Sequence, residues 1–508
     1  MMQNQSKSNI SVTKDYDVAI IGAGINGAVA AAALSAAGQK VLLIDKGDFA
    51  SFTSQESSSL IWGGIKYLQS YEFSLVFKLC MARNQLMRAY PNQISEIGFL
   101  ASIGPTAPFG RLLGTFGTLF YWGIGALGTL MPRSYSAKAA KALEPSLLSG
   151  RKAVLYYDAY LPDTDSRFVY DFIRQAKTFG SDVANYTELV GAKFDDSAWR
   201  LELLTSSGDI RVGAKSVINA TGPFASKVSD LLDAPTKASL VFSKGVHLIL
   251  DRKITTNDQV LAFWDEQKRL FYVLPMGDRS MIGTTDTRVD DPHTTLTDDD
   301  QAFVLKQINA QLDLEKPITK EQVISFRSGV RPLVVEAGKS GNVADWHQLS
   351  RKHIIETNSE KRVISILGGK LTDCLNVGEE VVAEFQKFGI KLSKPKGWFG
   401  ESGDQRKAEF FELVASKSGS GFAKEIATGL WRRHNEKAFE VIADQDSLED
   451  IVPGLGITKA ELEYIAKTEE VKTREDLLRR RLPIAMARSE KEIASNKKLQ
   501  KALEDVGL

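Results

Sequence analysis

Asp17-Val-Ala-Ile-Ile-Gly-Ala-Gly-Ile-Asn-Gly-Ala-Val-Ala-Ala-Ala-Ala-Leu34 decides the fold of this chain, together with the later run Val41-Leu-Leu-Ile-Asp45. An apolar run leads into a Gly-x-Gly-x-x-Gly turn, an alanine-rich helical run follows, and a second apolar run ends in an acid. A strand, a helix and a second strand in this order are the start of a Rossmann-type unit. The stretch therefore predicts a nucleotide-binding α/β domain.

Each glycine of the turn has its own predicted role. Gly22 permits the tight turn, Gly24 lets the backbone approach a pyrophosphate, and Gly27 lets the helix pack closely on the strand. The helix N-terminus offers free N–H groups and the positive end of its dipole to the phosphates. Asp45 lies where a carboxylate accepts a hydrogen bond from a ribose hydroxyl. These features predict a bound dinucleotide, and the fingerprint alone leaves FAD and NAD both open.

The bulk composition excludes several classes of protein. The 508 residues suffice for about three domains, and 43% hydrophobic with 25% charged residues is ordinary for a globular protein. The net charge of +1, with no basic half or tail, argues against nucleic-acid binding. Cys80 and Cys374 suggest no disulfide framework, which favours a reducing compartment. The five histidines lack metal-ligand spacing, so we expect no metal, and the polar residues 1–13 do not resemble a signal peptide.

One segment is uncharged over a length that can cross a bilayer. It runs from Leu112 to Pro132, and Arg111 and Arg133 flank it. We reject a membrane span, because the chain on both sides must return to one nucleotide-binding domain. Two interpretations stay open: a buried helix pair, and a surface that dips into the membrane interface with the arginines as anchors.

Strand and helix signals predict how the rest of the chain is organised. They alternate again over 153–221, as in a doubly wound sheet. Short strands separated by turns fill 243–286 and predict an antiparallel sheet of a second domain. The run 363–372 is a strand, a glycine turn and a helix start, which indicates a return to the first domain. From Gln405 onward the pattern is helical and charged, with Arg479-Arg-Arg481 near the end.

Seven motifs in one order resemble the FAD-dependent glycerol-3-phosphate dehydrogenases, a family of amino-acid-oxidase-like flavoproteins. The resemblance covers roughly residues 15–390 and, more weakly, the helical tail. The motifs are Gly22-Ala-Gly-Ile-Asn-Gly27, Thr53-Ser-Gln-Glu-Ser-Ser-Ser-Leu-Ile-Trp-Gly-Gly-Ile-Lys-Tyr-Leu68, Asn219-Ala-Thr-Gly-Pro-Phe224, Lys244-Gly-Val-His247, Ile282-Gly-Thr-Thr-Asp286, Ser328-Gly-Val-Arg-Pro-Leu333 and Gly368-Gly-Lys-Leu-Thr372.

The resemblance implies a fold that combines α/β and α+β parts: a Rossmann-type FAD-binding domain, an antiparallel-sheet substrate domain and a helical C-terminal domain. We expect the FAD-binding domain to be discontinuous. The expected ranges are 15–95, 150–235 and 350–392 for the FAD-binding domain, 96–149 and 236–349 for the substrate or cap domain, and 397–508 for the helical domain.

The resemblance also implies FAD as the cofactor and oxidation of sn-glycerol 3-phosphate to dihydroxyacetone phosphate, with electrons passed to membrane quinone. The expected location is cytoplasmic and peripheral, on the inner face of the cytoplasmic membrane. Whether the protein forms a homodimer is left open. Two alternatives remain. One is a related flavin oxidase that uses oxygen or accepts another small anionic alcohol or amine. The other is a non-catalytic flavin-binding redox module.

The fingerprint and the motifs together define the expected sites. Arg331 offers a fork for phosphate or a developing alkoxide, Lys370 lies at a glycine-rich helix start, and Lys66 and Tyr67 could line the substrate pocket. His247 is the expected base. The expected cofactor-binding residues are Gly22, Gly24, Asn26, Gly27, Asp45, Lys46, Thr53, Ser54, Ser57, Ser58, Gly63, Gly64, Leu189, Ala220, Thr221, Gly222, Gly368, Gly369, Lys370, Leu371 and Thr372.

Purely structural roles compete with these assignments. His247 could be a hydrogen-bonded strand residue, Arg331 a structural ion pair, and Lys66 part of a solvated helix face. The chain also departs from the family, which usually has Ser-Ser-Lys-Leu-Ile-His-Gly-Gly followed by an arginine before the tyrosine. Ser59, Trp62 and Lys66 stand at those places. The family's Lys-Leu-Thr-Thr-Tyr-Arg becomes Lys370-Leu-Thr-Asp-Cys-Leu375, so a cation near the flavin is lost.

Overall fold

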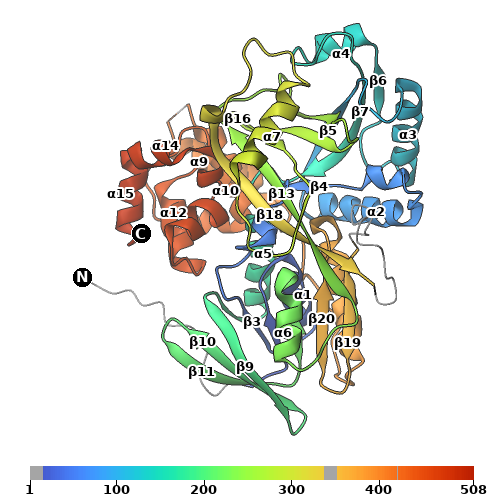
Figure 1. Ribbon diagram of the computed structural model, residues 1–508. Helices are drawn as coiled ribbons and strands as arrows, with labels where there is room; N and C mark the ends of the chain where they lie inside the picture. The colour runs from blue at the N-terminus through green and yellow to red at the C-terminus, as the bar shows by residue number, and fades with distance from the viewer. Residues whose placement is uncertain (1–14, 337–351, 420) are drawn as a thin grey trace.

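The structure is a computed structural model that describes residues 15–336, 352–419 and 421–508. Within these ranges the strands form three sheets, which we call the parallel sheet, the large sheet and the small sheet. Helices make up the C-terminal part of the chain (Figure 1). The predicted fold class, an α/β part joined to an α+β part with a helical end, is confirmed. The polar start of the chain, His347 and the end of the expected 236–349 segment lie outside the described residues.

The parallel sheet holds the fingerprint stretch at its centre. Its strand order is β19–β20–β12–β2–β3–β8, and every neighbouring pair is parallel except β19 with β20. β2 and β3 are buried along their whole length, because a parallel strand is covered on both faces. The bounds are Val18–Ile21 (β2), Val41–Ile44 (β3), Asp182–Ala184 (β8), Val217–Asn219 (β12), Ile354–Asn358 (β19) and Val363–Leu367 (β20).

Helix α1 (Ile25–Ala36) packs against this sheet. The run from Ala28 to Ala33 is completely buried, and its small side chains let α5 (Asp165–Thr178) and α8 (Cys374–Gln386) pack closely on α1. The alanine-rich sequence is therefore explained by packing on several sides. The predicted strand, helix and strand of the fingerprint are confirmed.

The large sheet has the order β17–β13–β16–β15–β14–β5–β7–β4, with β18 paired to β13 and β6 paired to β7. All these pairs are antiparallel except β14 with β5, so the antiparallel sheet predicted over 243–286 is confirmed. The bounds are Leu60–Ile61 (β4), Ser95–Ile103 (β5), Arg133–Tyr135 (β6), Lys152–Tyr160 (β7), Ser239–Leu250 (β13), Gln259–Trp264 (β14), Leu270–Met276 (β15), Arg279–Gly283 (β16), Thr287–Val289 (β17) and Val323–Val335 (β18).

The doubly wound pattern predicted over 153–221 is wrong for most of its strands. β7 belongs to the large sheet, where it runs antiparallel to β5. The segment 187–214 forms the small sheet together with β1, in the order β1–β11–β10–β9. A buried apolar run has the same appearance in any sheet, so periodicity does not show which sheet a strand joins. The bounds are Asp15–Tyr16 (β1), Thr187–Asp195 (β9), Ala198–Thr205 (β10) and Gly208–Ala214 (β11).

The uncharged segment contains a single helix with an exposed face, so the buried helix pair is wrong. α3 (Arg111–Ile124) buries Gly114, Thr118 and Tyr121, while its opposite face carries exposed apolar side chains. At about 1.5 Å per residue a helix of this length is shorter than the bilayer core. No helix in the described ranges is long and apolar enough to cross a membrane.

The remaining helices cap the large sheet and build the C-terminal part. α2, α4 and α7 lie with the large sheet, and α6 follows β12 (Figure 1). The helical prediction from Gln405 onward is confirmed. The bounds are Phe73–Ala89 (α2), Ala137–Leu143 (α4), Ala225–Leu231 (α6), Asp298–Asn309 (α7), Lys407–Lys417 (α9), Ala423–His434 (α10), Ala438–Val441 (α11), Lys459–Thr468 (α12), Ile484–Ala487 (α13), Glu490–Ser495 (α14) and Lys497–Asp505 (α15).

Two long strands of the large sheet, β13 and β18, form a ribbon that reaches the parallel sheet. β13 and β18 pair from Ser239 with Val335 to Leu250 with Val323. One end of the ribbon packs beside the parallel sheet, where Val334 contacts Leu367, and the other end lies in the core of the large sheet. Figure 1 shows this ribbon crossing the middle of the molecule.

Candidate functional site

A cavity of about 1440 Å³ lies between the parallel sheet and the large sheet. Its lining includes residues that directly follow β2, β3, β12 and β20, at the edge where open α/β sheets bind their ligands. The other wall comes from β13, β14, β15 and β18 of the large sheet. The volume exceeds the ~300–1,000 Å³ of a typical small-ligand pocket, so a dinucleotide and a small substrate can share it.

The fingerprint turn is shaped for close backbone approach. Gly22 has a φ of +96°, and a Cβ there would lie 2.7 Å from the Ala220 carbonyl oxygen. A Cβ at Gly27 would lie 1.8 Å from the Gly22 oxygen, so this position serves helix packing. The Ile25 amide donates to the Ser54 hydroxyl at 3.0 Å. The turn is thus built for a ligand that approaches the start of α1.

Asp45 is oriented before any ligand binds. One of its oxygens accepts from the Ala23 amide at 2.7 Å, and the other accepts from the Gly47 amide at 2.9 Å. Burial raises the pKa of Asp45 to about 6, although these two hydrogen bonds oppose the shift. The carboxylate lines the cavity, and its bond to a ribose hydroxyl stays a prediction from the sequence.

The second glycine turn meets the first one. The Asn26 side-chain amide donates to the Gly368 carbonyl at 2.9 Å, so α1 and the turn after β20 are directly joined. Gly368 and Gly369 both have positive φ values, +67° and +112°, which favour glycine. The Lys370 ammonium lies 4.1 Å from the centre of the Tyr67 ring, and the Lys66 ammonium lies 5.7 Å from it. Two predicted motifs thus place two lysines around one aromatic ring.

Arg331 reaches the cavity across β13. Its side chain crosses Gly245, where a Cβ would lie 2.1 Å from the guanidinium. The guanidinium donates to the Thr284 hydroxyl at 3.2 Å and lies 3.5 Å from the Asp286 carboxylate. About a quarter of the Arg331 side chain is exposed. The structural ion pair considered for Arg331 is therefore present, and the same group also lines the cavity.

His247 lies on β13 with only 2% of its surface exposed. Neither ring nitrogen has a hydrogen-bond partner among the described residues, so the alternative of a hydrogen-bonded strand residue is wrong. Burial, the charge of Arg331 and the charge of Arg327 lower the pKa of His247 to about 3. The imidazole is therefore neutral at physiological pH, and His247 belongs to the cavity wall with both of its nitrogens buried and without a hydrogen-bond partner among the described residues.

Most of the predicted site residues line this cavity together. They are Gly22, Gly24, Asn26, Asp45, Lys46, Thr53, Ser54, Ser57, Ser58, Lys66, Tyr67, Leu189, Ala220, Thr221, Gly222, His247, Arg331, Gly368, Gly369, Lys370, Leu371 and Thr372. Gly27, Gly63 and Gly64 are not among the residues that line the cavity, and their assignment to cofactor binding stays a prediction. Gly63 is a packing position, because a Cβ there would lie 2.2 Å from the Tyr121 hydroxyl.

Sequence reasoning missed part of the wall from the large sheet. Trp264 and Tyr272 line the cavity from β14 and β15, and Thr284 and Asp286 line it beside Arg331. The last two belong to a motif already singled out, so that motif was a usable signal. Trp62, which stands where the family usually has a histidine, also lines the cavity. Its backbone amide donates to the Thr372 hydroxyl at 3.0 Å.

No metal site competes with this cavity in the described ranges, where no three His, Cys, Asp or Glu side chains cluster suitably for a metal ion. Cys80 and Cys374 are free and buried.

Comparisons with known proteins agree with this geometry. The family described as "FAD dependent oxidoreductase" matches residues 17–357, more than half of the chain. The aerobic glycerol-3-phosphate dehydrogenase of Bacillus subtilis (strain 168) is 29% identical over 490 residues, which cover 92% of this chain and 87% of that protein. The mitochondrial glycerol-3-phosphate dehydrogenase of Homo sapiens is 29% identical over 459 residues, which cover 84% of this chain and 61% of that protein.

A solved structure shares the fold. The glycerol-3-phosphate dehydrogenase from Bacillus halodurans, complexed with FAD, is similar with a TM-score of 0.71 at 22% identity. The similarity covers 97% of this chain and 91% of that one. The nucleotide turn, the oriented Asp45 and the cavity at the carboxyl ends of the parallel strands fit FAD. With the family match over 17–357, these observations establish that the chain belongs to the FAD-dependent oxidoreductase family.

Proposed function

We propose that this protein uses FAD to oxidise sn-glycerol 3-phosphate to dihydroxyacetone phosphate. The observation that carries the proposal is the set of three cations, Lys66, Lys370 and Arg331, around the cavity wall that also holds His247. A phosphate dianion needs such cations, and an alcohol carbon needs a base for its hydroxyl proton. The similarity to the dehydrogenases of Bacillus subtilis and Homo sapiens supports the same substrate.

The FAD contacts follow from the two ends of the cavity. Asp45 would accept from the adenosine ribose, and the Gly22–Gly27 turn would receive the pyrophosphate. The turn from Gly368 to Thr372 would hold the flavin, and the Lys370 ammonium in this turn would stabilise negative charge on the reduced cofactor. FAD, when bound, supplies the hydride acceptor.

His247 is the proposed base. Its neutral ring has a nitrogen ready to accept the proton of the substrate C2 hydroxyl. Burial is the main cause of the low pKa of His247, followed by the charges of Arg331 and Arg327, and the negative phosphate of the substrate offsets only the part that comes from the two arginines. Arg331 then holds both the phosphate and the oxygen that loses its proton.

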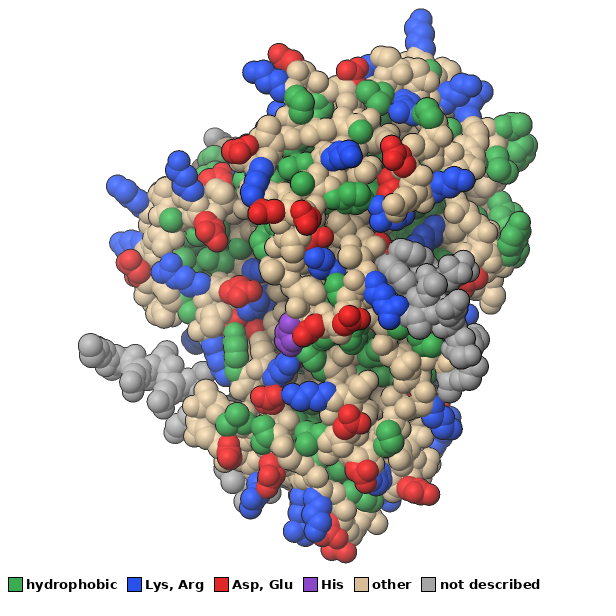
Figure 2. Space-filling view, in the orientation of Figure 1, with side chains coloured by type: hydrophobic (Ala, Val, Ile, Leu, Met, Phe, Trp, Pro, Cys, Tyr) green, Lys and Arg blue, Asp and Glu red, His purple; other side chains and the backbone are tan. Residues whose placement is uncertain are grey.

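We further propose that the protein docks on the inner face of the cytoplasmic membrane and passes electrons to quinone. Leu112, Phe116 and Phe120 of α3 are 72%, 62% and 52% exposed. The ring of Phe120 lies 5.7 Å from that of Phe73 at the start of α2, so the two helices share one apolar surface. Figure 2 shows hydrophobic side chains protruding at the edge where α2 and α3 lie in Figure 1.

This apolar surface borders the cavity. Ser70 and Glu72 line the cavity on either side of the exposed Tyr71, which contacts Phe73. Exposed apolar patches of this kind dock on membranes or partners, and aromatic rings favour the headgroup level. A membrane-soluble acceptor therefore reaches the mouth of the cavity without leaving the bilayer surface.

The domain ranges given above remain our proposal for the division of the chain, with β7 moved to the substrate domain.

An anaerobic titration of the purified flavoprotein tests the proposal. We expect glycerol 3-phosphate to bleach the flavin absorbance, while glycerol and small amines leave it unchanged. A quinone analogue should then restore the colour. Hydrogen peroxide released on admission of air, at the rate of turnover, would identify an oxidase instead. If no phosphorylated alcohol and no amine reduces the flavin, the result would favour the alternative of a non-catalytic redox module.

A further inference from the structure

Three consecutive arginines near the end of the chain are engaged by the cofactor-binding part of the molecule. Arg479, Arg480 and Arg481 end a single π-helical turn, η9 (Asp476–Arg481). Runs of charge are normally solvated, but Arg480 and Arg481 are 3% and 1% exposed. π-helical turns are rare in proteins, and those that occur are often found at functional sites. The proposed function assigns these residues no role.

All three arginines contact one segment, residues 48–56. Both terminal nitrogens of the Arg481 guanidinium donate to the Asp48 carboxylate, at 2.8 Å and 2.9 Å. Arg480 donates to the same carboxylate at 2.7 Å and to the Gln55 side chain at 3.3 Å. Arg479 reaches Glu56 at 2.9 Å. One helical turn therefore holds both ends of a short loop.

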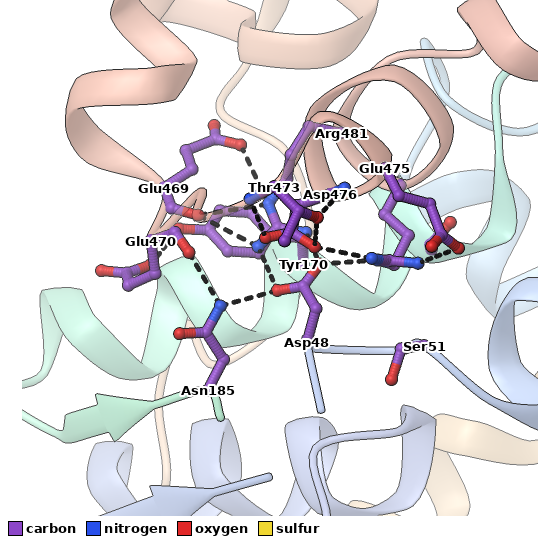
Figure 3. Close-up of polar contacts among 12 residues, drawn as sticks. Asp48, Ser51, Tyr170, Asn185, Glu469, Glu470, Thr473, Glu475, Asp476 and Arg481 are labelled. Carbon is purple, nitrogen blue, oxygen red and sulfur yellow. Dashed lines mark hydrogen bonds and ion pairs between the residues drawn. The ribbon is translucent and has the colours of Figure 1, made fainter. Parts of the chain in front are cut away.

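Asp48 is saturated by these contacts. Its side chain is fully buried and also accepts from the Asn185 amide at 2.8 Å, so four donors fix its two oxygens. Figure 3 shows Asp48 and Asn185 on one side of the network and Arg481 with Asp476 on the other. A carboxylate held by four donors, with a bidentate fork among them, has one defined position.

The excess positive charge is balanced locally. Arg480 also bonds Asp476 at 2.6 Å and Glu475 at 2.8 Å. Arg481 donates to the Glu469 carbonyl and lies 4.5 Å from the centre of the Tyr170 ring. Buried ion pairs seldom add more stability than apolar residues of the same volume, so stability alone gives weak reason for this network.

The braced loop is the one that carries the predicted FAD contacts. Asp45 precedes it by three residues, Ser54 within it holds the α1 start, and Ser57 and Ser58 follow it along the cavity wall. The Ser51 amide donates to the Asp48 carbonyl at 3.2 Å, which closes the turn between these groups. The position of Asp48 therefore determines where the cavity-lining residues on both sides of it lie.

We propose that Arg479, Arg480 and Arg481 are positioning residues for FAD, through which the helical C-terminal part holds the cofactor loop in its binding conformation. The inference rests on the proposed FAD contacts of Asp45 and Ser54. It predicts that loss of this brace weakens FAD binding beyond any loss of general stability.

The test compares two buried arginines of the C-terminal part. Arg481→Met removes the fork to Asp48. Arg433→Met removes a matched fork to Glu461, at 2.6 Å and 2.7 Å, that does not contact residues 45–58. FAD release from each purified holoprotein is followed by flavin fluorescence on dilution, and Tm is measured with and without excess free FAD. A ligand that binds only the folded state raises Tm by an amount that grows with the logarithm of the ratio of its free concentration to Kd.

We expect Arg481→Met to raise the Kd for FAD at least tenfold and to show a smaller rise of Tm on addition of the same FAD concentration, because stabilisation by a ligand grows with the ratio of its free concentration to Kd. Arg433→Met should lower Tm and keep the wild-type Kd. An unchanged Kd in Arg481→Met overturns the proposal. If Arg481→Met does not fold, the part-exposed Arg479→Gln and the charge-keeping Arg481→Lys decide in the same assay: a wild-type Kd in both overturns it.

These outcomes are separate from the proposed substrate. Reduction of the wild-type flavin by glycerol 3-phosphate is measured on its own, and its failure leaves the FAD affinities of the variants unaffected. In the converse case, the wild-type flavin is reduced normally while the Arg481 variants keep the wild-type Kd for FAD. That result would reject the positioning role of the arginines and leave the substrate proposal intact.

Discussion

The guanidinium of Arg331 occupies the space where a side chain at Gly245 would begin, with its Nη2 atom 2.1 Å from the position of a Cβ there. The two residues lie on the paired strands β18 and β13. Because the conflicting atoms are the far end of a flexible side chain, an alanine at 245 displaces the guanidinium instead of the backbone. The cavity thus owes the placement of its arginine to a glycine on the neighbouring strand.

Gly245→Ala should therefore lower kcat/KM for glycerol 3-phosphate and leave the fold and the FAD content intact. Loss of a charge-assisted hydrogen bond costs about 1.5–3 kcal/mol, which corresponds to roughly 10–100-fold. Arg331→Lys, which keeps the charge and removes the fork, should show a similar loss. Gly421→Ala, where a Cβ meets open space, is the control for steady-state kinetics. Normal efficiency in Arg331→Lys would exclude the bidentate role.

His247→Asn should slow anaerobic flavin reduction by about 10²–10⁴-fold, the usual cost of losing a general base. FAD should remain bound, because His247 lies on the wall that the large sheet provides. Stopped-flow mixing with glycerol 3-phosphate measures the reduction rate directly. A loss below roughly fivefold would point to water or Lys66 as the proton acceptor.

The same histidine should make stability depend on pH. Its pKa is about 3 in the folded chain, against the ordinary histidine value of 6.5 that applies in the unfolded chain. Between these two values the unfolded chain binds a proton that the folded chain does not. The free energy of unfolding therefore falls as pH falls from 6.5, by up to about 1.4 kcal/mol per pH unit. Urea unfolding at pH 7.5 and pH 5 should show a smaller difference in His247→Gln than in the wild type. Equal differences would show that burial of His247 does not disfavour its charge.

Asp45→Ala should raise the Kd for FAD by roughly 10–100-fold, from the loss of a charge-assisted hydrogen bond of about 1.5–3 kcal/mol. Since the pKa of Asp45 is about 6, the wild-type affinity should also fall as pH falls through 6, while that of the variant stays level. Ultrafiltration of bound and free flavin measures both. Asp195→Ala, on the hairpin of the small sheet, is the surface control. Parallel pH curves for wild type and Asp45→Ala would remove Asp45 from FAD binding.

Phe116→Ser with Phe120→Ser should release the protein from vesicles of anionic phospholipid, because buried apolar area drives interfacial docking. Trp122 is a poor choice for this test, since it is half-buried and its indole N–H donates to the Thr129 carbonyl at 2.8 Å. Phe422→Ser is the matched control, with the same 52% exposure as Phe120 but a place in the C-terminal part. Flavin reduction should be normal in all variants. A wild-type protein that never sediments with vesicles would end the membrane proposal.

The parts of the site that could be predicted are those encoded locally. Gly22, Gly24 and Asp45 follow one another within a strand, a turn and the next strand, so their spacing already contains the geometry. The exposure of α3 could not be predicted, because an uncharged segment is compatible with a core or with a surface. The sheet that β7 joins was equally hidden, since its apolar residues suit either sheet.

The burial of Arg480 and Arg481 depends on partners far away in the sequence. Asp48 is 433 residues from Arg481, and no local pattern connects them. A run of three arginines is typical of a solvated surface, and only the fold shows that an acidic side chain receives them. The same reason hid Gly245, whose importance lies in a side chain from another strand.

The β13–β18 ribbon has a mechanical consequence. Its strands are continuous from the core beside Leu367 to the core of the large sheet, and they form the cavity wall in between through His247 and Arg331. Two continuous hydrogen-bonded strands act as a strut, because bending them would break their ladder. We therefore expect the ribbon to limit any movement of the two halves of the molecule relative to each other, and turnover should depend little on solvent viscosity.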